Sequence, residues 1–449
     1  MNNKYTAQNL RQLDGKITVA QAIPFGLQHI LAMFVANIAP LLIVAGACEL
    51  DAASTAKLIQ SAMIVAGIGT MLQIYPIGRI GSGLPIVLGL SFTFVAALCY
   101  IGPAYGYGVV VGAVIVGGIV EMVLGLFAKY WLGFISPIVA ASVVTAIGFS
   151  LLPVGATSFG GGSGSADFGS SENLILGTIT LVCCLGFNIV AKSFWKQLSV
   201  LFGLIVGYIA ACFMGVVDFS SLDSVGIIAL PEVLPFKPEF HLNAILTVIV
   251  IYLVSMTEGI GDTSALASTG LNRPATVKEL SGSLACDGFT SVLSGLLGSL
   301  PITSFSQNVG LVSMTKVVNR FTIATGAVIM ILAGIFPIFG AVLATLPDAV
   351  LGGCTIMMFG TIVVSGIQML GRCGYTQRNI TITALSLSIG LGFTQVPEIF
   401  AIFPRIVQTV FAENCVAVVF IVAIILNLVL PKNMDAHTPD AESETIAEE

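Results

Sequence analysis

The sequence has 449 residues, of which 56% are hydrophobic and only 9% are charged, with a net charge of −6. Ordinary globular domains contain roughly 25% charged residues, so this chain has too few charges to cover the surface of a soluble protein of its length. The composition therefore predicts an integral membrane protein. The 17 Lys and Arg residues form no basic patch, which argues against a nucleic-acid partner.

The two ends of the chain are polar. Residues 1–18 contain no short apolar stretch with a small-residue cleavage site, so we expect a cytoplasmic tail and not a cleaved signal. Residues 431–449 contain six acidic residues and one Lys, and we expect an acidic, disordered cytoplasmic tail there. The membrane portion is then residues 19–430.

Apolar segments recur along this membrane portion. A helix that crosses a bilayer needs about 20 mostly apolar residues, and fewer when it is broken by a loop. The fourteen candidate spans cover residues 19–45, 56–76, 86–99, 105–127, 131–152, 173–190, 196–215, 241–262, 279–298, 305–318, 320–344, 348–370, 378–395 and 411–430. We therefore predict an all-α integral membrane protein with 14 transmembrane segments.

The basic residues give an independent test of how the chain is oriented in the membrane, because they were not used to choose the spans. With the N-terminus inside, 14 of the 17 Lys and Arg residues fall in cytoplasmic segments and 3 in outer segments, as the positive-inside rule requires. The inner residues are Lys4, Arg11, Lys16, Arg79, Lys129, Lys192, Lys196, Arg273, Lys278, Lys316, Arg320, Arg372, Arg378 and Lys432, and the outer ones are Lys57, Lys237 and Arg405. Both termini are thus expected in the cytoplasm.

The third and tenth spans are short, and Gly and Pro interrupt both. Gly81-Ser-Gly-Leu-Pro-Ile86 precedes one, and Gly298-Ser-Leu-Pro-Ile302 precedes the other. They are the third elements of two sets of seven, and the fifth elements match as well, with Pro137 and Pro347 near their starts. Because seven is odd, the second set of spans must enter the membrane from the side opposite to the first set. The pattern predicts a 7+7 inverted repeat whose broken elements mark a transporter's midplane site.

Four carboxylates lie at membrane depth, where ionisable groups are costly and mark candidate functional residues. Glu121 lies near the inner end of a Gly-rich span, which favours a structural role. Glu258 and Asp262 are four residues apart and therefore share one helical face. Packing against Ser and Thr would satisfy them too, but their place beside a broken span favours a function. The fourth is Asp287.

The tenth element contains two adjacent amides, Gln307 and Asn308. Pro301 and the hydroxyl residues after it favour an extended approach, and a helix can begin near Asn308. The free N–H groups of that helix end would lie at the midplane, and the two amides would face the same cavity. A polar cap on a kinked helix is the alternative interpretation.

The stretch Gln307-Asn-Val-Gly-Leu-Val-Ser-Met-Thr-Lys316 resembles the signature of the nucleobase–ascorbate transporter family, also called nucleobase:cation symporter-2. The resemblance covers essentially the whole membrane portion. Further positions similar to the family's motifs are Gln28-His29 in the first span, Ser91-Phe92 in the third, Glu258 and Asp262 in the eighth and Asp287 in the ninth.

The resemblance implies two domains with a substrate between two short strands. Spans 1–4 and 8–11, about residues 19–127 and 241–344, would form a core domain. Spans 5–7 and 12–14, about residues 131–215 and 348–430, would form a gate domain. The implied substrate-binding residues are Ser91, Phe92, Glu258, Gln307 and Asn308, where Asn308 orients Gln307. The implied coupling residues are Asp287, Asp262 and His29.

The function that the resemblance implies is secondary active uptake of a purine nucleobase, xanthine, urate or both, by symport with a cation, expected to be a proton. Gln307 is similar to the purine carriers, whereas uracil carriers have Glu there, so a uracil or pyrimidine:proton symporter is the alternative. Ser91 leaves xanthine versus urate open. The implied location is the cell membrane, and homodimer formation is left open.

Two other function classes fit the sequence less well. A membrane enzyme would need a nucleophile–base pair, a metal cluster or a phosphate loop, and the sequence shows none. A channel would more naturally show rings of pore-lining residues than a two-domain inverted repeat. We expect no cofactor and no metal.

Overall fold

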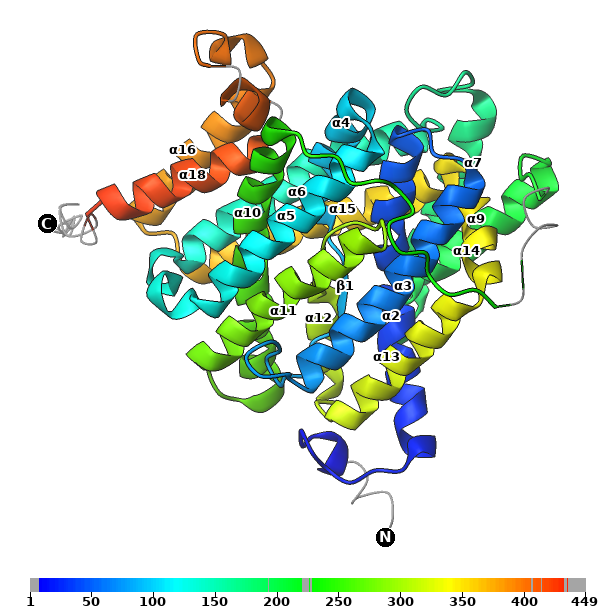
Figure 1. The fold of residues 1–449 in the computed structure, drawn as a ribbon, viewed down its shortest axis with the longest axis horizontal. Helices are drawn as coiled ribbons and strands as arrows, with labels where there is room; N and C mark the ends of the chain where they lie inside the picture. The colour runs from blue at the N-terminus through cyan, green and yellow to red at the C-terminus, as the bar shows by residue number, and fades with distance from the viewer. Residues whose placement is uncertain are drawn as a thin grey trace, which may run out of the picture.

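The structure is a computed structural model that describes residues 8–192, 194–219, 226, 228–404, 407–412, 414–431 and 434. Helices of many lengths pack around one another, and the first described residues lie at the lower edge of the view in Figure 1. The expected acidic tail of 431–449 lies almost wholly outside the described residues. Lys4, Arg405 and Lys432 lie outside them too.

Most of the chain is helical. The long helices are α2 (Val19–Ala47), α3 (Ala52–Ile74), α5 (Tyr107–Leu126), α6 (Pro137–Phe159), α7 (Ser171–Val190), α9 (Ser199–Met214), α10 (Leu242–Leu271), α11 (Val277–Leu296), α13 (Arg320–Ile335), α15 (Asp348–Cys373), α16 (Gln377–Thr394) and α18 (Cys415–Val429). The shorter elements are β1 (Leu88–Leu90), η1 (Phe92–Phe94), α4 (Val95–Tyr105), η2 (Ala128–Tyr130), η3 (Leu132–Phe134), α8 (Phe194–Gln197), β2 (Ile302–Ser304), α12 (Ser306–Thr315), α14 (Pro337–Ala344), η5 (Pro397–Phe400) and η6 (Gln408–Ala412).

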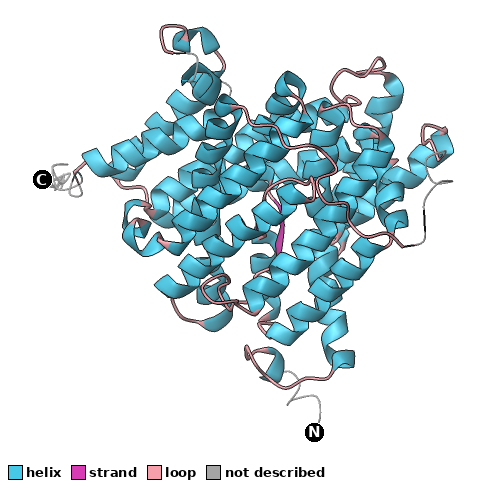
Figure 2. Cartoon of the chain, viewed as in Figure 1, coloured by secondary structure: helices cyan, strands magenta, loops and turns pink. Residues whose placement is uncertain are grey.

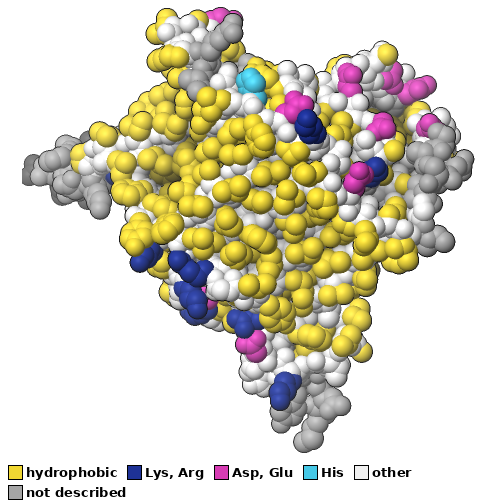
Figure 3. All heavy atoms as spheres, in the orientation of Figure 1, with side chains coloured by type: hydrophobic (Ala, Val, Ile, Leu, Met, Phe, Trp, Pro, Cys, Tyr) yellow, Lys and Arg dark blue, Asp and Glu magenta, His cyan; other side chains and the backbone are white. Residues whose placement is uncertain are grey.

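The helices have the length and composition of membrane spans. Seven helices in the described part of the chain are long and apolar enough to cross a bilayer, and the bent pair α13–α14 adds an eighth if it counts as one span. Figure 3 shows an apolar face, with most Lys and Arg toward the lower left and most Asp and Glu toward the upper right. A multi-pass membrane protein is therefore confirmed, whereas the number fourteen stays a prediction.

Several span boundaries were wrong. The fifth span was expected at 131–152, but α6 covers Pro137–Phe159 and two short 3-10 turns precede it. Pro153 lies inside this helix, where neighbouring helices can satisfy the freed carbonyl. The eighth span was expected at 241–262, but α10 continues to Leu271, where Asn272 in a left-handed conformation ends the helix. The expected inner loop of 263–278 is thus mostly helical.

The eleventh span is not one straight helix. It was expected at 320–344, but α13 and α14 meet at an angle of 75° around Phe336. Pro337 is the first residue of α14. Proline lacks an N–H and clashes with the preceding turn, so it fits the first turn of a helix and kinks or ends a helix that its neighbours do not hold together. The bend therefore coincides with a proline at the start of a new helix.

The helices pack in two groups. In the first, α5 packs on α10 and α11, α13 packs on α2 and α3, and α14 packs on α3. In the second, α6 packs on α15 and α18, α7 packs on α9 and α15, and α16 packs on α18. Helices α2 and α10 also contact members of the second group. The broken elements belong to the first group and lie near this border.

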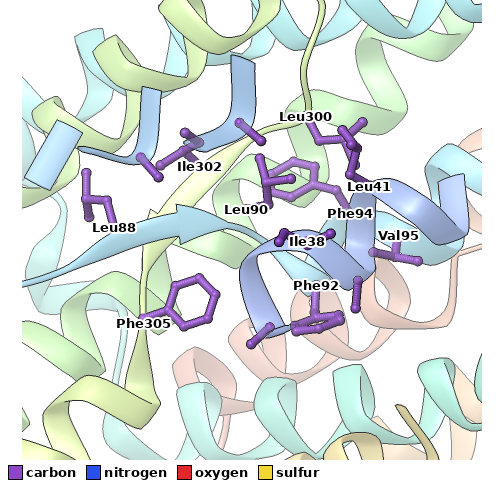
Figure 4. Packing of buried hydrophobic residues seen from close by; sticks show 14 of the residues in the cluster. Ile38, Leu41, Leu88, Leu90, Phe92, Phe94, Val95, Leu300, Ile302 and Phe305 are labelled. Carbon is purple, nitrogen blue, oxygen red and sulfur yellow. The ribbon is translucent and has the colours of Figure 1, made fainter. Parts of the chain in front are cut away.

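The two broken elements pair with each other through an antiparallel two-stranded sheet. Leu88 lies opposite Ser304, and Leu90 lies opposite Ile302. Figure 2 shows a strand near the centre of the molecule, surrounded by helices, and Figure 4 shows the apolar side chains packed around the pair. Buried side chains accept hydrogen bonds from β1 N–H groups that do not bond β2. Asn37 accepts from Leu90 at 2.8 Å, and Thr70 accepts from Leu88 at 3.0 Å. Irregular backbone is tolerated at membrane depth only under such conditions.

The N-terminal segment packs against the N-terminal end of α13. The Asn319 side-chain amide donates to the carbonyls of Asn9, Gln12 and Gly15, the last at 2.8 Å. The Arg320 guanidinium donates to both carboxylate oxygens of Asp14, at 2.9 and 3.0 Å. The described part of the expected tail is therefore held in a defined conformation.

Candidate functional site

Helix α10 presents two carboxylates to the broken elements. Glu258 is half-buried and accepts a hydrogen bond from the Thr93 hydroxyl at 2.9 Å, in the first broken element. Asp262 is buried and accepts from Ser304 at 2.8 Å and Ser306 at 2.7 Å, in the second. The two acids share one face of α10, as their spacing predicts. Glu258 thus connects α10 to the first broken element, and Asp262 connects it to the second.

Ser91 and Phe92 follow β1 directly. Ser91 is buried, and its hydroxyl oxygen accepts the backbone N–H of Thr93 at 3.3 Å, which caps the short helix η1. Phe92 packs edge-on against Phe359 of α15, with ring centroids 5.4 Å apart and an angle of 83° between the rings. Since α15 belongs to the other helix group, Phe92 lies at the border between the two groups.

Gln307 and Asn308 lie in the first turn of α12. This helix begins at Ser306, two residues before the expected start. Gln307 is half-buried, whereas Asn308 is 1% exposed, and no side-chain amide atom of Asn308 has a hydrogen-bond partner among the described residues. Asn308 therefore makes no side-chain hydrogen bond to Gln307 in the described structure, and its role in orienting Gln307 stays a prediction. Its buried amide can still bind a polar group.

Asp287 on α11 lies behind the strand pair. One oxygen accepts from the Gln73 amide of α3 at 3.1 Å, and the same amide donates to Ser283 at 3.0 Å. The carbonyl oxygen of Gln73 accepts the backbone N–H of Ser82, in the loop that leads to β1. The buried His29 has no hydrogen-bond partner for Nδ1 in the described chain. The structure thus joins Asp287, but not His29, to the broken element by hydrogen bonds.

Six residues at this site were not expected from the sequence: Gln73, Thr93, Ser283, Ser304, Ser306 and Phe359. Thr93 and Ser304 stand beside expected residues, so a search for hydroxyl donors in both broken elements would have found them. Gln73 lies 214 positions from Asp287, and nothing in the sequence links the two. Phe359 lies in a long apolar helix, where one aromatic ring carries no distinguishing signal.

Two glycines mark free space beside the polar groups. Gly261 is three residues after Glu258 on α10, and Gly310 is three residues after Gln307 on α12, so each shares a face with its polar neighbour. A Cβ atom built at either glycine would meet no atom within 4 Å. A half-buried acceptor, a half-buried amide and a phenyl ring thus lie on elements that contact one another, and the two glycines add no side chain beside them. Such a set suits a flat molecule with N–H and C=O groups.

Known proteins resemble this chain over nearly its whole length. A family model described as "Permease family" matches residues 20–399. Xanthine permease XanQ of Escherichia coli K12 is 36% identical over 436 residues, which cover 94% of this chain and 93% of the relative. Uric acid permease PucK of Bacillus subtilis is 38% identical over 384 residues, which cover 85% and 89%.

Two solved structures share the fold at low sequence identity. The transmembrane domain of the cyanobacterial bicarbonate transporter BicA matches with a TM-score of 0.57 at 17% identity, covering 93% of this chain and all of that one. The murine Slc26a9 anion transporter in its inward-facing state matches with a TM-score of 0.61 at 12% identity, covering 92% and 69%. At this identity the likeness concerns the fold alone.

Proposed function

Since the chain belongs to the Permease family, whose model matches it over residues 20–399, we propose that it takes up a purine nucleobase by symport with a cation, the proton. The family match confirms the resemblance to nucleobase–ascorbate transporters, and it makes the protein a transporter and not an enzyme. The proposed substrate is xanthine, urate or both. Relatives at 36% and 38% identity are named for these two purines.

The observation that best supports this proposal is that Glu258 and Asp262, on one face of α10, bind the two broken elements, and that Gln307 lies in the second of them. A purine-dione presents ring N–H donors and carbonyl acceptors on adjacent edges. The carboxylate accepts N–H groups, and the amide both donates and accepts. Phe92 would cover the ring face. A uracil carrier is the weaker alternative, because Gln307 resembles the purine carriers; Ser91 leaves xanthine and urate open.

We propose the coupling and domain arrangement on the same basis. Asp262 and Asp287, with His29, would respond to the proton, because Asp262 binds the second broken element directly and Asp287 is linked to the loop before the first through Gln73. Fourteen spans in a 7+7 inverted repeat would divide into a core domain of spans 1–4 and 8–11 and a gate domain of the others. The two helix groups support this division. The proposed location is the cell membrane, and a homodimer is compatible with the exposed apolar faces.

The experiment that tests the function is uptake of radiolabelled xanthine, urate and uracil by cells that lack their own nucleobase carriers. We expect saturable uptake of at least one of the two purines, with competition by the unlabelled purine and loss after a protonophore. Saturable uptake of uracil alone would overturn the purine assignment. Uptake that persists in the presence of the protonophore and follows a sodium gradient would show that the coupling cation is not the proton.

The proposed orientation places residues 155–170 outside the cell. It places the C-terminal end of α10 and the N-terminal end of α11 in the cytoplasm. Ser163 and Ser268 are both exposed, so cysteines placed there are accessible to a label. We expect an impermeant thiol reagent, added to intact cells, to modify Ser163→Cys and not Ser268→Cys. The unsubstituted chain is the control, because its nine native cysteines give the background. The opposite pattern would reverse the orientation.

A further inference from the structure

The connection between α5 and α6 exposes aromatic side chains. Residues 127–136 contain the turns η2 and η3 and join the first helix group to the second. Phe127, Tyr130 and Phe134 are 53%, 69% and 54% exposed. Three large rings on so short a segment are unfavourable in water, whereas aromatic rings are favourable at the interface between a bilayer and water. The connection therefore has the surface of a segment that lies among lipid headgroups.

The other side of this connection is fixed to the protein. The Trp131 indole N–H donates to the carbonyl of Leu124 at 2.9 Å, in the last turn of α5. Ala128 is fully buried and belongs to a small apolar cluster with Met256 of α10 and Leu284 of α11. The exposed rings are thus presented from a segment that the protein holds in place.

Basic side chains accompany the rings. Lys129 is exposed, and its Nζ atom lies 4.6 Å from the centre of the Tyr130 ring. Arg79 is exposed in the turn before β1, and its guanidinium donates to the carbonyl of Leu126. Lys278 is exposed in the first turn of α11. Figure 3 shows Lys and Arg side chains gathered along the lower left edge of the apolar face.

Backbone contacts bring the start of α11 to the same place. The Ser281 hydroxyl donates to the carbonyl of Gly125 at 2.7 Å, near the end of α5. The backbone N–H of Gly81 donates to the carbonyl of Gly282 at 2.9 Å. Lys278 is one turn before Ser281 on the same helical face. The end of α5, the turn before β1 and the start of α11 therefore meet.

Little negative charge balances these basic side chains. The sequence contains no Asp or Glu in residues 75–81 or 122–136. Glu279, in the first turn of α11, pairs with Arg273 at 2.6 Å and completes the capping box of its own helix. The charge that remains on the three meeting segments is positive. In a bilayer, the group that complements such a charge beside interfacial rings is an anionic lipid headgroup.

We propose that residues 127–134, with Arg79 and Lys278, form a binding surface for an anionic phospholipid. The headgroup phosphate accepts hydrogen bonds from the basic side chains, and the exposed rings lie beside the upper part of the acyl chains. A lipid bound there fixes the connection between the two helix groups to the membrane surface. By the proposed orientation this is the cytoplasmic leaflet. The inference depends on the membrane placement of the helices and not on the transported substrate.

Tryptophan fluorescence tests this inference directly, because the chain has two tryptophans, Trp131 and Trp195. In Trp195→Phe, Trp131 is the single reporter. The purified protein is reconstituted into phosphatidylcholine vesicles that contain an equal fraction of brominated phosphatidylcholine or brominated phosphatidylglycerol. Bromine quenches only an indole that lies close to it. We expect stronger quenching by the brominated phosphatidylglycerol, which shows that the anionic lipid is enriched beside Trp131.

Lys129→Gln in the Trp195→Phe background removes one positive charge and keeps the rings. We expect the preference for phosphatidylglycerol to fall by roughly twofold to fivefold, the contribution of one basic side chain near an anionic surface. Lys192→Gln is the matched control, because Lys192 is an exposed lysine directly beyond the end of α7. We expect this control to leave the preference unchanged.

Three results would overturn the inference. Equal quenching by the two brominated lipids would remove the preference for an anionic headgroup. Quenching by neither lipid would show that the connection does not lie at the membrane surface. An equal preference in Lys129→Gln and Lys192→Gln would separate the lipid from the proposed surface. Because the measurement needs no substrate, a failure of purine uptake would overturn the proposed function and leave this result intact.

Discussion

Glu258→Gln is expected to lose purine binding by at least about tenfold while the protein still folds. The substituted side chain keeps an oxygen that can accept from Thr93. It loses the charge, and its new N–H donors face the N–H donors of the ligand. A hydrogen bond to a charged group contributes roughly 1.5–3 kcal/mol, and about 1.4 kcal/mol is one decade in affinity. Binding to purified protein, measured beside uptake in cells, gives the result.

Asp262→Asn is the matched comparison, one turn further along α10. Ser304 and Ser306 donate to Asp262, and a serine hydroxyl can turn to accept from an amide. We therefore expect a smaller loss of binding than in Glu258→Gln, with a larger effect on proton-driven accumulation. Wild-type xanthine and urate binding by Glu258→Gln would remove Glu258 from the substrate site.

Gly326→Leu is expected to remove most of the folded protein. A Cβ atom at Gly326 would lie 2.6 Å from the carbonyl oxygen of Gly26, so helices α13 and α2 touch backbone to backbone there. A side chain must push the two helices apart, and overpacking costs typically about 1–3 kcal/mol, and more where backbone has to move. That is a large part of a typical stability of about 5–15 kcal/mol. The measurement is the yield of monodisperse protein on size-exclusion chromatography in detergent.

Gly186→Leu is the control for this substitution. Gly186 is an exposed glycine of α7, and a Cβ atom there would meet nothing within 4 Å. Both substitutions gain the same helix propensity, about 0.8 kcal/mol, so their difference isolates the helix contact. Equal yields of the two variants would show that α2 and α13 can separate at no cost.

The membrane class and the centre of the site could be predicted because both leave local signals. Hydropathy indicated the spans, and Gly and Pro at corresponding places marked the two breaks that the structure contains at β1 and β2. The spacing of Glu258 and Asp262 placed them on one helical face. The structure shows that each accepts a hydrogen bond from a different broken element.

Helix ends and distant partners could not be predicted in the same way. The fifth span was expected to end at residue 152, but Pro153 lies inside α6, whereas Pro337 stands at a bend in a segment that was expected to be one span. Proline acts alike on the local backbone in both places, and only the surrounding helices decide whether the span continues. Gln73 and Phe359 owe their places to contacts between parts of the chain that are far apart in sequence, which a periodic pattern does not record.

The pairing of β1 with β2 also constrains how the protein is made. When the first half of the chain has entered the membrane, Leu88 and Leu90 have Thr70 and Asn37 as partners, but the pairing groups that face β2 have none until residue 304 has been synthesised. During this interval the first break exposes unpaired backbone groups at membrane depth, where each costs several kcal/mol. Either half made alone should therefore be held by insertion factors or degraded, and two halves encoded separately should accumulate only when they are made together.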